Sequence, residues 1–289
     1  MDSWYTYTII ALFAFGIQRF LYKVSAARKC NTAWTTFAFM GTVALLGSFS
    51  FIAVKEAVPD VLFLLFISFV NSASFLAGTM ATMEALKHIS TSIAYPIIRL
   101  NTGIVVIFSI LYFKDSLSAY QVAGIIIAIS VILILTRYGD NGDHDKTSDR
   151  NMKAGFTLIF TALFAGAIAA ISSKFAALHT QPLGFIAVSY TMSTLFSLGL
   201  RKRLQGKEEN PNNRDALIIG LCMGLVNFVG FYFLLRALSV GPLSIIISIT
   251  GMYFVIAIIL SAWIYKERLT ILRIAGIVLT IISITLMRI

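Results

Sequence analysis

Charged residues are scarce in this sequence. Asp, Glu, Lys and Arg make up 12% of the 289 residues, whereas 58% are hydrophobic. A soluble domain carries about a quarter charged residues, because its surface has to be hydrated. The scarcity excludes an ordinary water-soluble enzyme and requires most of the surface to face lipid. We therefore expect an all-α integral membrane protein that crosses the cell membrane several times.

Cysteines and enzyme motifs are also missing. Cys30 and Cys222 are the two cysteines, too few for a disulfide framework or a cysteine metal site. His144 and His179 have no second ligand at metal spacing, and no P-loop, G-x-S-x-G or H-E-x-x-H sequence occurs. The sequence predicts that the protein is not an enzyme and holds neither a metal nor a cofactor.

Long apolar runs are what the sequence has instead. A helix needs about 20 apolar residues to cross the hydrocarbon core. Ten runs of this kind predict ten membrane spans, at residues 3–23, 32–53, 60–86, 91–113, 116–137, 153–177, 181–200, 215–238, 242–264 and 267–288. The first run lacks the basic flank of a secretory signal, so we expect it to be retained as a span.

The two halves of the chain repeat each other. Both contain the pattern K-[DE]-x-L-x5-A-G, which fixes a charged turn and a glycine at one spacing. The matched positions include Lys114-Asp115 with Lys266-Glu267 and Ser92 with Ser244 at a shift of 152 residues, and Lys23 with Lys174 at a shift of 151. Each half contributes five spans, and because five is odd the two copies enter the membrane with opposite orientation. We expect repeats at residues 1–138 and 153–289, joined by a polar linker at 139–152.

Basic residues outnumber acidic ones by 23 to 13. In a membrane protein this excess is typical of loop charge, so we expect no nucleic-acid partner. Fifteen of the 23 basic residues follow the first, third, fifth, seventh and ninth spans. The positive-inside rule makes those loops cytoplasmic and places both termini outside.

Polar side chains at membrane depth are the natural candidates for a binding site, because they are costly unless they face a cavity. Arg99 lies near the middle of the fourth span, in a segment that also holds Tyr95, Pro96 and Asn101. Pro96 removes a backbone hydrogen bond and tends to interrupt a helix. Arg99 is either a cationic anchor for a substrate or a structural residue bound to carbonyls that Pro96 frees.

Further candidates lie in other spans. Gln18 and Arg19 are in the first span, where Arg19 either binds substrate or extends toward the lipid headgroups. Asn71 and Asn227 lie near the centres of the third and eighth spans and either bind substrate or bridge helices. Tyr253 occupies the repeat position of Asn101, and its side chain either packs between helices or lines a cavity.

Glu84 and His88 are four residues apart and share one helical face. They could form a proton relay, or they could both contact interfacial water beside Lys87. Small residues at spacing of four, such as Gly220 with Gly224, and Ala162 with Gly166 and Ala170, predict close helix packing.

The pattern [DE]-x-L-[ST]-x-x-[QR]-x-x-G occurs at residues 115–124 and 267–276. With an Ala-Leu pair about 30 residues before each copy, it resembles the EamA domain of the drug/metabolite transporter superfamily. The resemblance implies a ten-helix carrier with inverted repeats and a central cavity lined by spans 1, 3, 4, 6, 8 and 9. Many members are drawn with cytoplasmic termini, so this resemblance and the loop charges favour opposite orientations.

The deep charges indicate the kind of substrate. Arg99 and Arg19 are cationic and no carboxylate is clearly embedded, so we expect an anionic or zwitterionic small molecule, such as an amino acid or another carboxylate-bearing solute. The expected activity is transport by alternating access, with export as one direction that it can take. The lipid bilayer is the other expected partner. The alternative is a passive pore or facilitator, which would need a continuous polar lining.

Overall fold

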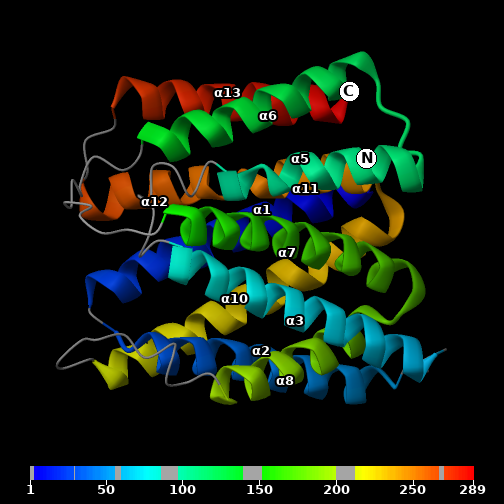
Figure 1. The fold of residues 1–289 in the computed structure, drawn as a ribbon, viewed down its shortest axis with the longest axis vertical. Helices are drawn as coiled ribbons and strands as arrows, with labels where there is room; N and C mark the ends of the chain where they lie inside the picture. The colour runs from blue at the N-terminus through cyan, green and yellow to red at the C-terminus, as the bar shows by residue number, and fades with distance from the viewer. Residues whose placement is uncertain are drawn as a thin grey trace.

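The computed structural model describes residues 3–28, 30–55, 60–85, 97–138, 152–199, 212–266 and 270–289. Most of these residues are helical, and none of them belongs to a strand (Figure 1). The helices are α1 (Ser3–Ala27), α2 (Thr32–Val54), α3 (Val61–Ala85), α5 (Asn101–Phe108), η1 (Ser109–Phe113), α6 (Ala119–Tyr138), α7 (Met152–His179), α8 (Pro182–Gly199), α10 (Asn213–Val240), α11 (Leu243–Gly251), α12 (Phe254–Tyr265) and α13 (Ile271–Arg288).

Seven stretches of the described chain are long and apolar enough to cross a membrane: Ser3–Ser25, Ala33–Val54, Val61–Thr82, Lys153–His179, Pro182–Gly199, Asn213–Val240 and Leu243–Tyr265. Three shorter apolar helices accompany them, at Ile97–Phe113, Ala119–Ile134 and Ile274–Arg288. The all-helical, multi-pass membrane architecture expected from the apolar runs is thereby confirmed.

Local sequence explains where α2 begins and ends. The Asn31 side chain accepts hydrogen bonds from the backbone N–H groups of Ala33 at 3.0 Å and Trp34 at 3.3 Å, and it thereby caps the first turn. Lys55 ends the helix with a φ of 52°, in the left-handed region. Lys114 and Lys266 end their helices in the same way, with φ of 55° and 53°. These two lysines occupy matched positions of the sequence repeat, so both halves end this helix identically.

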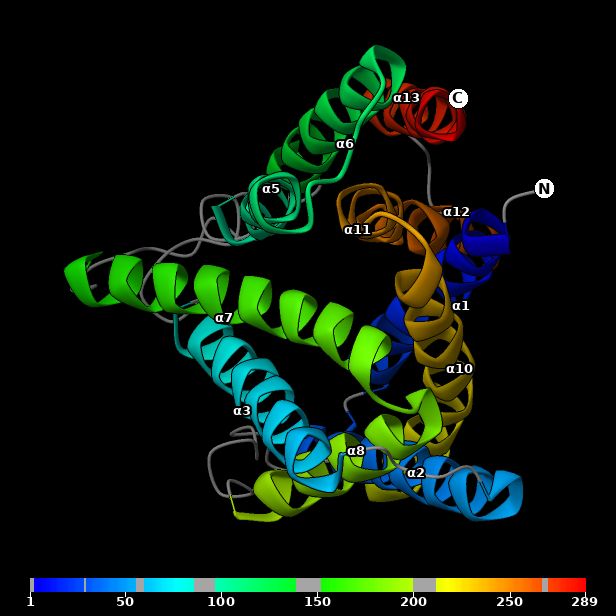
Figure 2. The ribbon, with the colours of Figure 1, turned by 90° about the vertical axis from the view of Figure 1, so that its right-hand side faces the viewer.

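The first and second halves of the chain are packed against each other. α3 lies along α7, α1 along α10, α2 against α8 and α6 against α13 (Figures 1 and 2). Each pair joins one helix from residues 3–138 to one from residues 152–289. The largest buried apolar cluster likewise contains residues of both halves, such as Phe39, Val43, Phe185 and Phe231.

Glycines allow α10 to approach α2 closely. A Cβ atom on Gly220 would lie 2.8 Å from the Thr35 carbonyl oxygen, and one on Gly224 would lie 2.9 Å from the Phe39 carbonyl oxygen. No side chain fits at such distances without a shift of the backbone. The close packing predicted for Gly220 and Gly224 is confirmed.

Two spans that match in the repeat are irregular. α5 passes into the π-helical turn η1 at Ser109, a change of winding that is common at functional sites. α11 ends at Gly251, and α12 starts at Phe254. Tyr253 lies in this interruption, and its side chain lines a cavity between the helices.

Candidate functional site

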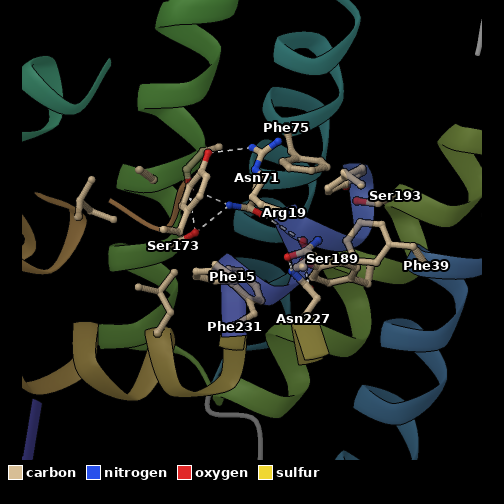
Figure 3. Close-up of a pocket in the computed structure, with 18 residues that line it drawn as sticks. Phe15, Arg19, Phe39, Asn71, Phe75, Ser173, Ser189, Ser193, Asn227 and Phe231 are labelled. Atoms are coloured by element: carbon tan, nitrogen blue, oxygen red, sulfur yellow. Dashed lines mark hydrogen bonds between the residues drawn. The ribbon is translucent and has the colours of Figure 1, made fainter. Parts of the chain in front are cut away.

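A cavity of about 300 Å³ lies in the interior of the helix bundle. Side chains of α1, α2, α3, α7, α8, α10 and α11 line it, together with Tyr253 (Figure 3). Five residues predicted from the sequence lie in this lining: Gln18, Arg19, Asn71, Asn227 and Tyr253. Tyr22 and Phe75 also line the cavity and remain 38% and 42% exposed.

Tyr253 is the common partner of two arginines. The Arg19 guanidinium donates to the Tyr253 hydroxyl at 2.9 Å, and its carbon lies 4.9 Å from the ring centroid. The Arg99 guanidinium carbon also lies 4.9 Å from that centroid. Both distances are within the range of cation–π attraction. This contact favours a place for Arg19 at the cavity over an extension toward the lipid headgroups, and Arg19 remains an exposed residue.

Arg99 and Asn101 line a second cavity of about 150 Å³. Phe15, Ala170 and Tyr253 line both cavities, so the two adjoin. Asn101 fits there because Gly166 has no side chain: a Cβ atom on Gly166 would lie 2.6 Å from the Asn101 amide nitrogen. Gly166 thus makes room for a polar side chain.

The charge of this region is positive. No aspartate or glutamate is among the described residues that line either cavity. Of the carboxylates that the structure describes, none forms an ion pair with Arg99; Asp215 pairs at 3.1 Å with Arg28, outside both cavities. The Arg99 guanidinium is therefore held by an aromatic ring in a site whose described polar lining is otherwise neutral apart from Arg19.

A buried hydrogen-bond chain holds Asn227 in the cavity wall. The Asn227 amide donates to Gln18 Oε1 at 2.9 Å, and the Tyr190 hydroxyl donates to Asn227 Oδ1 at 2.6 Å. The chain links α1, α8 and α10. Sequence reasoning missed Tyr190, because a tyrosine in an apolar span usually packs or anchors at the membrane surface.

Asn71 makes a denser set of contacts. Its amide nitrogen lies 2.9 Å from the Ala169 carbonyl and 2.9 Å and 3.1 Å from the hydroxyls of Ser172 and Ser173, and its oxygen accepts from Ser189 at 3.2 Å. These contacts join α3 to α7 and α8. They favour the helix-bridging role for Asn71, although it also lines the cavity. The serines were not predicted, since isolated hydroxyls are common in membrane helices.

Several predicted residues are not placed. Tyr95, Pro96 and His88 lie outside the described residues, and of Glu84 only its position in α3 is described. The proton relay and the helix break at Pro96 therefore stay predictions.

The fold is shared with a solved structure. One crystal structure, described only as that of a protein, superimposes with a TM-score of 0.79 over 98% of both chains at 12% sequence identity. At this identity the likeness shows a shared fold alone. A search of curated protein sequences finds no match.

The sequence also matches a family model, in two copies. The model is that of the EamA-like transporter family, and the matches span residues 2–137 and 153–289. The resemblance expected from the repeated charged turns is confirmed. Since the two matches cover nearly the whole length, the chain belongs to the EamA-like transporter family.

Proposed function

We propose that the protein is a secondary transporter of the cell membrane that moves small carboxylate-bearing solutes, such as amino acids, by alternating access. The observation that carries the substrate class is the convergence of Arg19 and Arg99 on Tyr253 at the cavity. Guanidinium groups bind carboxylates through paired, charge-assisted hydrogen bonds. A cationic solute would find no counter-charge among the described lining residues.

The rest of the cavity suits a small amphipathic solute. Its volume of about 300 Å³ is at the lower end of the range for small-molecule sites. Gln18 and Asn227 offer neutral polar groups, while Phe15, Phe39 and Phe231 supply apolar surface. A carboxylate at Arg99 and an apolar side chain of the solute against these rings would satisfy both parts of the lining.

The helix pairing supports ten spans in two inverted repeats, at residues 1–138 and 153–289 with a linker at 139–152. Exchange of the halves converts the α3–α7 pair into α10–α1 and leaves the α2–α8 and α6–α13 pairs unchanged. A two-fold relation between the halves requires this pattern. Inverted repeats around a central site are the usual architecture of alternating access, which favours a carrier over a passive pore.

The test is transport by the purified protein in vesicles. Candidate amino acids and organic acids are first screened for thermal stabilisation, because a ligand stabilises the state that it binds. Arg99→Ala and Arg99→Lys are then compared with the unmodified protein. Loss of one charge-assisted contact of about 1.5–3 kcal/mol predicts at least a tenfold rise in KM. Arg99→Lys keeps the charge but not the planar pairing, so its KM should lie between that of the unmodified protein and that of Arg99→Ala.

Arg288→Ala is the matched control, because Arg288 also lies over a ring, that of Tyr5 at 5.6 Å, but lines neither cavity. Its KM should not change. Undiminished transport of a carboxylate by both Arg99 variants would refute the anchor role.

The second test distinguishes a carrier from a pore. In vesicles preloaded with unlabelled substrate, a carrier should take up labelled substrate faster than in empty vesicles. An uptake rate that does not depend on the internal substrate would favour the pore.

A further inference from the structure

Three of the described residues that line the main cavity, the one of about 300 Å³, are exposed. They are Arg19 and Tyr22 in α1 and Phe75 in α3, whereas the other described lining residues are buried or half-buried. All three belong to the second halves of their helices. Because only the span α2 separates α1 from α3, these two helices end on the same face of the membrane. The exposed part of the lining therefore lies toward the face at which α1 ends.

Two cations follow each other along α1 in that direction. Arg19 and Lys23 are four residues apart, so they share one side of the helix and lie about 6 Å apart along its axis. Lys23 is exposed, and its ammonium lies 5.4 Å from the ring centroid of Tyr265, the last residue of α12. The Arg19 guanidinium carbon lies 5.5 Å from the Tyr22 ring centroid. Both distances are within the range of cation–π attraction, so a ring holds each cation beside the path from the cavity to the face.

The surroundings of these cations are basic. At the ends of α1 and α12 and the start of α10, the described charged residues beyond Lys23 are Arg28, Arg214 and Lys266, with Asp215 as the acidic one. Asp215 pairs with Arg28 at 3.1 Å. An exposed guanidinium such as that of Arg19 is costly against lipid tails. Water on this side of α1 would remove the cost and connect the cavity to the solution.

Buried hydrogen bonds join the helices at the opposite end of the main cavity. Lys174 follows the lining residue Ser173 and is 6% exposed. Its ammonium donates to the carbonyl oxygens of Leu238 at 2.5 Å and Gly241 at 2.9 Å, at the end of α10. Carbonyls at a helix end lack partners within the helix, so they can compensate the burial of the charge. A Cβ atom on Gly241 would lie 2.8 Å from that of Trp4, so this end of the cavity is near the start of α1.

Asp115 adds further bonds at this end. Its carboxylate accepts from the hydroxyls of Ser109 at 2.5 Å and Ser244 at 2.7 Å, and from the Ser244 backbone N–H at 3.1 Å. These bonds join the segment after η1 to the start of α11. A solute that entered here would have to break them, whereas at the end of α1 it would meet exposed cations.

We infer that Arg19 and Lys23 form an anion-guiding path from the face at which α1 ends to the substrate site, with Lys23 as its outer residue. The inference rests on the proposed function for the identity of the anion, a carboxylate. Charges of one sign beside low-dielectric walls focus the electric field and raise the local concentration of ions of the opposite sign. Lys23 is thus a positioning residue: it speeds the arrival of anions at Arg99 and Tyr253 and disfavours cations.

The test measures how fast charged reagents reach the cavity of the purified protein in a neutral detergent. Ala170→Cys, a position that lines both cavities, is the reporter in a chain with Cys30→Ala and Cys222→Ala. The reporter is modified in parallel with a methanethiosulfonate reagent that carries a sulfonate and with one that carries a quaternary ammonium. The ratio of the two rates reports the electrostatic potential along the path, and it can be measured whether or not a transported substrate is known.

Replacement of Lys23 should change the two rates in opposite directions. Lys23→Gln removes one positive charge, whatever else the ammonium contacts, so it should lower the sulfonate rate about threefold and raise the rate of the quaternary ammonium. Lys23→Glu should lower the sulfonate rate about tenfold, and Lys23→Arg should restore it. The differences should shrink between about 0.01 M and about 1 M salt, because the Debye length falls from about 30 Å to about 3 Å.

Arg288→Gln is the matched control. It also removes a cation that lies over a ring, that of Tyr5 at 5.6 Å, but Tyr5 is near the start of α1. Both rates should stay unchanged. Misfolding of a Lys23 variant would change both rates in the same direction, which separates it from the loss of a guiding charge.

Equal rate ratios in Lys23→Gln and the reporter protein, a loss that Lys23→Arg does not restore, or no labelling by either reagent would overturn the path. If the unmodified protein transports a carboxylate in vesicles and the ratio does not depend on Lys23, the path alone fails. If the ratio depends on Lys23 but none of the screened carboxylates is transported, the proposed function fails and the positive path is supported.

Discussion

At the scale of single residues, Tyr253 organises the site. It accepts a hydrogen bond from Arg19 and presents its ring to both Arg19 and Arg99. A cation–π contact contributes about 0.5–2 kcal/mol, more as the pair is desolvated. The two guanidinium groups repel each other. Their attraction to one shared ring offsets this repulsion and holds them near each other before a substrate anion binds.

This arrangement predicts graded effects at Tyr253. Tyr253→Phe keeps the ring and loses the hydroxyl, so we expect a rise in transport KM of about threefold to tenfold, the equivalent of one ordinary hydrogen bond. Tyr253→Leu loses both contacts and should raise KM further. The measurement is concentration-dependent uptake of the best carboxylate found. Tyr120→Leu, an exposed tyrosine away from both cavities, is the control. Equal KM values for the two Tyr253 variants would argue against a role for the ring.

Depth in the membrane was a useful guide to the cavity lining. Gln18, Arg19, Asn71, Asn227 and Tyr253 all line the main cavity, and Arg99 and Asn101 line the adjoining one. The hydroxyls of Tyr190 and Ser189 could not be predicted in the same way. A hydroxyl can bond to a carbonyl of its own helix, as Thr191 does to Ala187 at 2.7 Å, so its presence at depth does not identify a cavity.

At the scale of elements, the interruption between α11 and α12 was hidden in an apolar run. The Met252 and Tyr253 N–H groups bond to carbonyls three residues back, Ile249 at 3.1 Å and Thr250 at 3.1 Å. This tighter winding turns Tyr253 relative to α11. No proline marks it, and Gly251 alone is a weak signal. Sequence periodicity locates such a span but not the break that orients its central residue.

The α2–α10 contact predicts a difference between two glycine substitutions. A Cβ atom at Gly224 would lie 2.5 Å from the Thr42 Cβ atom, whereas at Gly103 in α5 it would meet nothing within 4 Å. Gly224→Ala should therefore destabilise the protein by about 1–3 kcal/mol through overpacking. Gly103→Ala should be neutral or slightly stabilising, because alanine favours a helix. Thermal denaturation in one detergent compares them, and equal melting temperatures would contradict the close contact.

At the scale of the whole molecule, neither half encloses the site by itself. Arg19 and Asn71 belong to the first half, and Tyr190, Asn227 and Tyr253 to the second. The sequence indicated the repeats and their spans. It could not identify which helices pair across the halves, because apolar faces resemble one another and lipid competes equally for all of them.

This shared core predicts the behaviour of a divided chain. Fragments 1–145 and 146–289, expressed together, should assemble and bind the same carboxylates, since the cut falls in the polar linker predicted at residues 139–152. Each fragment alone should be degraded or aggregate, because α3, α1 and α2 lose their partners α7, α10 and α8. Co-purification through a tag on one fragment is the measurement. A single fragment that is monomeric, stable and able to bind would contradict the shared core.

The partners of Lys174 have a genetic consequence. Its acceptors are main-chain oxygens of Leu238 and Gly241, and every amino acid at those positions also has a main-chain oxygen. In a saturation mutagenesis survey, nearly all replacements of Lys174 should therefore lose this contact. Replacements of Leu238 should keep the acceptor oxygen, and only those with an unsuitable size or polarity should impair the protein. Covariation between paired side chains, the usual signature of a contact in related sequences, would not report it.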